Sequence, residues 1–114
     1  MPTFNAKQAL DQIEGDRESL SVLLSTFTRV FPEQIVELRG AIADQDAEKL
    51  AALAHRFKGS LGLFAADAAA AIVRQLEVHA HESDFNGANS ALSELDAECR
   101  QLVIDLAAFL HTAD

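Results

Sequence analysis

The sequence predicts an all-α fold, an antiparallel four-helix bundle with a short extra helix at the N-terminus. Alanine and leucine dominate a composition that is 49% hydrophobic, with 5 glycines, 2 prolines and neither tryptophan nor tyrosine. That composition favours helices and leaves few of the residues that β-strands prefer. Apolar residues also recur at spacings of three and four, and the breaks between these segments are short. The 114 residues are enough to bury one core, so we expect a single domain over residues 1–114.

Glycine and aspartate delimit the first two expected helices. A short helix is expected from about Asn5 to Ile13, where Gly15 stops it. Asp16 is a candidate N-cap for a long helix. Pro32 interrupts this long segment, which predicts either one kinked helix or two abutting helices. The apolar stripe of the segment consists of Leu20, Leu23, Leu24, Phe27, Phe31, Ile35, Leu38 and Ile42.

Polar breaks separate the remaining helices. Residues 44–46, Asp-Gln-Asp, form the first break, and the next helix is expected from about Ala47 to Phe64. Asp67 is a candidate cap for a helix that runs to about His81. The next break contains Ser83-Asp84 and Asn86-Gly87, and the last helix runs to about His111. Its apolar stripe is Leu92, Leu95, Cys99, Leu102, Leu106 and Phe109.

The charge of the chain argues against several classes of function. Nine Lys and Arg residues against eighteen Asp and Glu residues give a net charge of −9. Such a surface repels nucleic-acid backbones and anionic lipids, so we expect no nucleic-acid partner. No apolar run is long enough for insertion into a membrane, and the N-terminus lacks the pattern of a signal peptide. The single Cys99 leaves no internal disulfide. We therefore expect a cytoplasmic protein.

The helix expected over 47–64 has two contrasting faces. At about 100° per residue, its apolar side chains share one side, and His55 points in the opposite direction. Five small or basic residues lie within about 60° of His55 on the outer face: Ala51, Ala52, Lys58, Gly59 and Gly62. Each of the two glycines costs the helix roughly 1 kcal/mol relative to alanine. We interpret them as clearing side-chain bulk, so that another protein's active site can reach the imidazole.

The chemistry of these residues suits phosphoryl transfer. Neutral imidazole has a free nucleophilic nitrogen near pH 7, and it can accept a phosphoryl group and later surrender it. Lys58, one helical turn after His55, can neutralise charge on the phosphoryl oxygens. Arg56 and Lys49 add positive charge to the same helix, which would suit docking onto an acidic pocket that holds a carboxylate and a metal ion. Leu63, near the helix end, is either a loop-packing residue or a docking contact.

The residues around His55 resemble a known family. His55, Lys58 and Gly59 form an H-x-x-K-G pattern, and the segment from Asp46 to Ser60 is similar to the histidine-containing phosphotransfer (HPt) family. The runs Gly15-Asp-Arg-Glu-Ser-Leu and Phe31-Pro32-Glu33 extend the resemblance over nearly the whole chain. The resemblance implies a module that relays a phosphoryl group between receiver-domain aspartates in a two-component multistep phosphorelay. Within it, His55 would be the phosphorylation site, with Lys58 and Gly59 supporting it.

The resemblance also assigns a role to Glu77 on the following helix. In that family a Gln or Glu at the matching position bonds to the second ring nitrogen, and here it would accept a hydrogen bond from Nδ1–H of His55. This bond would hold the tautomer that leaves Nε2 free to attack. Alternatively, Glu77 is a surface residue paired with Arg74 or His81. The family often has glycine where this chain has Ala65, so we expect a slightly different helix end there and no loss of activity.

The resemblance implies partners but no bound cofactor. The expected partners are receiver domains of response regulators or of hybrid histidine kinases, and the Mg²⁺ would sit on the receiver. No glycine-rich phosphate cradle is present, so the module is expected to hold no ATP, and no metal site is expected. His79 and His81 project about 200° apart on a helix and could not easily share an ion. The expected docking residues are Ala51, Ala52, Arg56, Gly59, Gly62 and Leu63.

Two other functions are compatible with the sequence. The first is a non-catalytic helical adaptor that binds receivers through the strip around His55 without carrying phosphate. The second is the phosphorylated N-terminal domain of a chemotaxis-type histidine kinase. The module could also be either a free-standing protein or part of a hybrid sensor histidine kinase.

Overall fold

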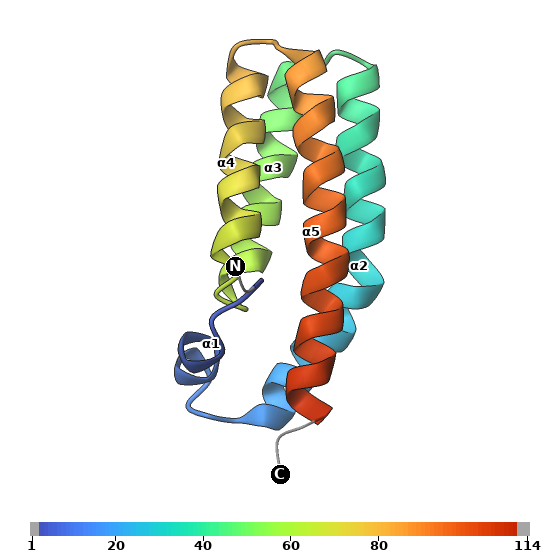
Figure 1. Ribbon diagram of the computed structural model, residues 1–114. Coiled ribbons are helices and arrows are strands. Elements are labelled where there is room, and N and C mark those ends of the chain that lie inside the picture. The colour runs from blue at the N-terminus through green and yellow to red at the C-terminus, as the bar shows by residue number, and fades with distance from the viewer. Residues whose placement is uncertain (1–2, 112–114) are drawn as a thin grey trace.

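Four long helices and one short helix make up the fold. The computed structural model describes residues 3–111, and this part of the chain contains no β-strand. The helices α2 to α5 form an antiparallel bundle in which each packs against its neighbours in sequence and α5 closes the ring against α2, while α1 lies against α2 (Figure 1). This architecture confirms the predicted fold class. The helices are α1 (Ala6–Gln12), α2 (Arg17–Ala43), α3 (Ala47–Gly62), α4 (Asp67–His81) and α5 (Phe85–His111).

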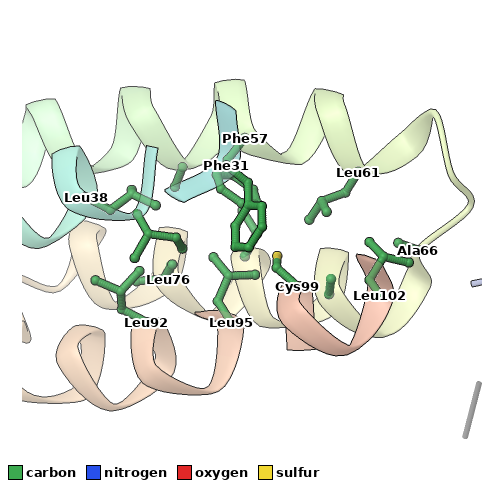
Figure 2. Packing of buried hydrophobic residues seen from close by; sticks show 14 of the residues in the cluster. Phe31, Leu38, Phe57, Leu61, Ala66, Leu76, Leu92, Leu95, Cys99 and Leu102 are labelled. Carbon is green, nitrogen blue, oxygen red and sulfur yellow. The ribbon is translucent and has the colours of Figure 1, made fainter. Parts of the chain in front are cut away.

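The predicted apolar stripes meet along the axis of the bundle. Figure 2 shows Phe31 and Leu38 of α2, Phe57 and Leu61 of α3, Leu76 of α4, and Leu92, Leu95, Cys99 and Leu102 of α5 converging on one core. Phe27 is the centre of an aromatic cluster, with ring centroids 5.1 Å from Phe31, 6.4 Å from Phe57 and 5.3 Å from Phe64. Phe57 is 0% exposed. Burying a side chain of this size stabilises the fold by roughly 1.5–3 kcal/mol, so α3 is held firmly by its inner face.

The turns after α2, α3 and α4 share one conformation. One residue in each turn is left-handed: Gln45 at φ 53°, Ala65 at φ 51° and Ser83 at φ 54°. The N–H of the next residue then bonds back across the helix end, as from Asp46 to the carbonyl of Ala41 at 3.0 Å. This pattern satisfies carbonyls that a helix end otherwise leaves open. Because the next helix starts directly afterwards, the turns are short and the helices antiparallel.

Aspartates cap three of the helices, but the predicted cap at Asp67 is wrong. Asp16 and Asp46 accept hydrogen bonds from the first turns of α2 and α3, as predicted for Asp16. The cap position of α4 is occupied by Ala66, which makes no side-chain hydrogen bond, and Asp67 lies within the first turn. Ala66 is 1% exposed, and the N–H of Asn5 donates a hydrogen bond to the carbonyl of the preceding residue, Ala65. A polar cap there would be buried, whereas Asp67 remains exposed and still interacts favourably with the helix dipole.

One open expectation about helix boundaries is decided, and two others are revised. The helix α2 continues through Pro32, so it is one helix and not two. The helix α3 ends at Gly62, two residues before the expected Phe64. The expected break at Asn86-Gly87 lies inside α5, because Asp84 already caps that helix by accepting from the N–H of Gly87 at 2.9 Å.

The segment before α1 is tied to the C-terminal part of α5. Thr3 donates a hydrogen bond to Asp105 at 2.6 Å, and Phe4 packs edge-on against Phe109 at 5.5 Å. Arg17 donates to the carbonyl of Phe109 at 2.8 Å, and its guanidinium lies 4.3 Å from the centre of that ring. The hydrogen bond from Thr3, and then that from Gln101, lowers the pKa of the Asp105 carboxyl.

None of the described helices is long and apolar enough to cross a membrane.

Candidate functional site

His55 projects outward from the middle of α3. Its side chain is 77% exposed, whereas the neighbouring core residues Ala54 and Phe57 are 0% exposed. The orientation is the one that helix geometry predicts, because the inner face of α3 is held by the core. The imidazole is therefore open to a second molecule.

Lys58 and Glu77 meet beside His55. Nζ of Lys58 donates to Oε1 of Glu77 at 2.8 Å. The other carboxylate oxygen, Oε2, lies 3.7 Å from Nδ1 of His55, which is longer than a hydrogen bond. Glu77 therefore faces the ring nitrogen that the family resemblance implies for it, but its short contact is with Lys58. Within residues 3–111 its ion-pair partners are His55 and Lys58, and not Arg74 or His81.

The packing of α4 against α3 brings these three residues together. On α4, Leu76 and Val73 are 0% exposed and face the core. Glu77 follows Leu76 and so lies on the flank of α4 that borders α3. The side chains of Lys58 and Glu77 are 32% and 26% exposed. Their ion pair is thus partly sheltered and is less screened by salt than a pair on the open surface.

The residues expected to dock a partner lie on α3 before and after His55 in sequence, and Leu63 directly follows the helix. Ala51 is half-buried and Ala52 is exposed, and Leu63 is 45% exposed. Gly59 and Gly62 are exposed as well, and a Cβ added to either glycine would have no atom within 4 Å outside its own helix. Packing inside the domain therefore does not require glycine at these two positions. Arg56, which is also exposed, adds positive charge to this strip.

An apolar hollow adjoins the strip on its α2 side. Its volume is about 100 Å³, and it is lined by Leu23 and Val30 of α2, by Ser60 of α3 and by Leu63, which directly follows α3. The Oε1 atom of Gln34, which also lines the hollow, is buried and has no hydrogen-bond partner in the described part of the chain. Of these residues, only Leu63 is predicted from the sequence as a docking contact. The remaining lining residues are Thr26, Phe27 and Phe64.

Two other reactive side chains lie away from His55. His79, near the end of α4, is 28% exposed, and its Nδ1 lies 3.3 Å from Oδ2 of Asp84. Cys99 is 0% exposed in the core, as its place in the α5 stripe predicts. Burial, and then the Asp96 and Glu98 carboxylates, raises the pKa of the Cys99 thiol to about 12. A thiol that stays protonated in the core is a packing group and not a nucleophile.

Comparisons with known proteins agree with this fold. A family model described as "Hpt domain" matches residues 22–108, a range that includes His55, Lys58 and Glu77. Among solved structures, the crystal structure of histidine-containing phosphotransfer protein B (HptB) from Pseudomonas aeruginosa PAO1 is similar, with a TM-score of 0.86 and 23% sequence identity. The similarity covers 99% of this chain and 98% of that chain, so the two share a fold over nearly all of their lengths. No match is found among curated protein sequences.

Proposed function

Because the chain belongs to the Hpt domain family, it is a histidine phosphotransfer module of phosphorelay signalling, and we propose that His55 is the residue that carries the phosphoryl group. The observation that supports this assignment is the 77% exposure of the His55 side chain next to the Lys58–Glu77 ion pair. His79 is a poorer candidate, because it is more buried and faces Asp84.

The proposed reaction is an in-line displacement at phosphorus. Nε2 of His55 attacks the phosphorus of an aspartyl phosphate on a receiver domain; the N–P bond forms, the P–O bond breaks, and the aspartate leaves as a carboxylate. The proton on Nδ1 stays on the ring. In the reverse step a receiver aspartate attacks the same phosphorus and Nε2 leaves. Such transfer relies mainly on positioning and electrostatic stabilisation.

The supporting residues act on charge and orientation. We propose that the ammonium of Lys58 balances negative charge on the phosphoryl oxygens, because it lies one turn from His55 on the same helix. Glu77 Oε2, 3.7 Å from Nδ1, is placed to accept that N–H after a small movement of either side chain. The module brings no metal ligand to this step; the Mg²⁺ belongs to the receiver in this proposal.

The docking surface is proposed to be the strip around His55 together with the hollow between α2 and α3. Hpt domains work with receiver domains, whose phosphorylation pocket is acidic. Arg56 and Lys49 on α3 provide opposite charge in a chain whose net charge is −9. Ala52 has a small side chain, and Gly59 and Gly62 have no Cβ, so the receiver can approach the imidazole of His55 closely. The apolar hollow beside Leu63 offers a contact that excludes water.

Phosphoryl transfer from a loaded receiver tests the proposal. Receiver domains encoded in the same genome are phosphorylated with a small-molecule donor and mixed with the module. We expect label on the wild-type chain and on His81→Gln, a matched change at an exposed histidine of α4, but none on His55→Gln. A His55→Gln chain that is still labelled would refute the assignment. A wild-type chain that binds receivers but is never labelled would instead support a non-catalytic adaptor.

A further inference from the structure

The carboxylate of Glu77 serves two groups at once. One oxygen is 2.8 Å from Nζ of Lys58, and the other is 3.7 Å from Nδ1 of His55. In the unphosphorylated chain, Lys58 is therefore already neutralised by a partner on another helix. The cation that is expected to receive the phosphoryl group is not free before that group arrives.

A phosphoryl group on Nε2 would compete with Glu77 for this cation. A phosphoryl group carries a charge of about −1.5 to −2, against −1 for a carboxylate. Lysine holds its charge at the end of a flexible four-carbon stem, so a rotation of Lys58 moves the ammonium without moving α3.

We propose that Lys58 is exchanged between two anions: Glu77 holds it in the resting module, and the phosphoryl group takes it when His55 is phosphorylated. This inference rests on the function proposed above. Phosphorylation then requires the Lys58–Glu77 ion pair to break. When the phosphoryl group leaves for an acceptor aspartate, the ion pair re-forms. Glu77 thus lowers the equilibrium stability of the phosphohistidine and favours onward transfer.

A double-mutant cycle tests the exchange. Glu77→Gln removes the charge but keeps an amide oxygen that can accept from Nδ1–H, and Lys58→Met keeps an apolar stem without the ammonium. The measured quantity is the ratio of phosphorylated to unphosphorylated module at equilibrium with a phosphorylated receiver. We expect Glu77→Gln to raise this ratio by roughly two- to fivefold when Lys58 is present, the range for a partly exposed ion pair. In the Lys58→Met background, Glu77→Gln should leave the ratio unchanged.

A matched control is available on α5. Asp96 pairs with Arg100 at 3.1 Å, and among the described helices α5 packs against α2 and α4 but not α3. Asp96→Asn is the same carboxylate-to-amide change at another ion pair, and it should leave the ratio unchanged. Circular dichroism of every variant checks that the bundle is intact.

Each other outcome of the cycle overturns the exchange. An equal rise in both backgrounds would mean that Glu77 acts by direct repulsion of the phosphoryl group. A fall or no change with Lys58 present would leave Glu77 as a residue that only orients the ring. In both of these cases His55 is still phosphorylated, so the proposed function stands. A wild-type chain without phosphohistidine at position 55 would overturn the function and the exchange together.

Discussion

The backbone N–H of Asn5 donates a 3.1 Å hydrogen bond to the carbonyl of Ala65, which joins the N-terminal segment to the turn at the end of α3. Ala65 stands at a position where the family resemblance led us to expect glycine. It is 3% exposed and holds a left-handed conformation at φ 51°. The turn that follows the His55-bearing helix is therefore shaped by a segment sixty residues earlier in the chain.

We predict that Ala65→Gly changes the free energy of unfolding by less than about 1 kcal/mol. Glycine removes the steric penalty of the left-handed conformation, about 1–2 kcal/mol, which raises the free energy of unfolding. It also removes a buried methyl group worth about 0.8 kcal/mol and increases the conformational entropy of the unfolded chain, and both effects lower the free energy of unfolding. Ala65→Val should instead lower the free energy of unfolding by more than about 1 kcal/mol, because a β-branched residue fits this conformation poorly. Urea denaturation measures both. A valine variant as stable as the wild type would contradict this account of the turn.

Gly59→Ala should stabilise the fold and slow phosphoryl transfer. A Cβ at position 59 meets no atom within 4 Å outside its own helix, so alanine should add about 0.5–1 kcal/mol of helix stability. The same methyl group would stand in the path of the receiver. Gly40→Ala on α2 is the matched control, because it is equally open but lies outside the proposed docking strip. Stopped-flow transfer rates and thermal melts separate the effects; equal transfer rates for the two variants would remove the role of Gly59.

Cys99 should make the stability of the bundle fall at alkaline pH. Its pKa is raised from 9.0 to about 12 by burial, so the folded chain keeps a proton that the unfolded chain loses. The protonated Cys99 thiol therefore makes its full contribution to the free energy of unfolding below pH 9. This contribution declines as the pH rises from 9 towards 12. Comparing wild type with Cys99→Ala by urea denaturation at pH 8 and pH 10 isolates this group. A stability difference that does not shrink at pH 10 would contradict the assignment.

Lys58→Ala should slow phosphoryl transfer to His55 by roughly tenfold while the fold is retained. The ammonium is partly exposed, so its effect should lie between that of a surface ion pair and that of a buried oxyanion donor. Rapid-quench transfer kinetics measure the change, with circular dichroism as the check on folding. Rates equal to the wild type would remove Lys58 from the mechanism.

The sequence predicted the bundle and the direction of His55 because both depend on helical periodicity within one segment. A stripe of leucine and phenylalanine leaves one way for α3 to face the core, and the opposite side follows from 100° per residue. Asp16 was predicted as a cap for the same reason, since capping is local. The cap at Asp67 was wrong because the cap position falls on the buried Ala66, in a turn that is hydrogen-bonded to Asn5, a residue distant in sequence.

The contacts between helices could not be predicted from the sequence. The family resemblance placed Glu77 near His55, but the Lys58–Glu77 ion pair depends on how far α4 is shifted along α3, which no local pattern encodes. The hollow beside Leu63 likewise depends on how α2 and α3 pack. The one local hint was that His55 and Lys58 are three residues apart on one face, where a carboxylate from a neighbouring helix can reach both.

The identity of the phosphorylated residue is the most direct test of the account. After incubation with a phosphorylated receiver, the wild-type module is digested at alkaline pH, where phosphohistidine survives, and its peptides are sequenced by fragmentation mass spectrometry. We expect phosphate on His55 and on no other residue. Phosphate on His79, His81 or His111, or a chain that carries none while a loaded receiver is present, would contradict it.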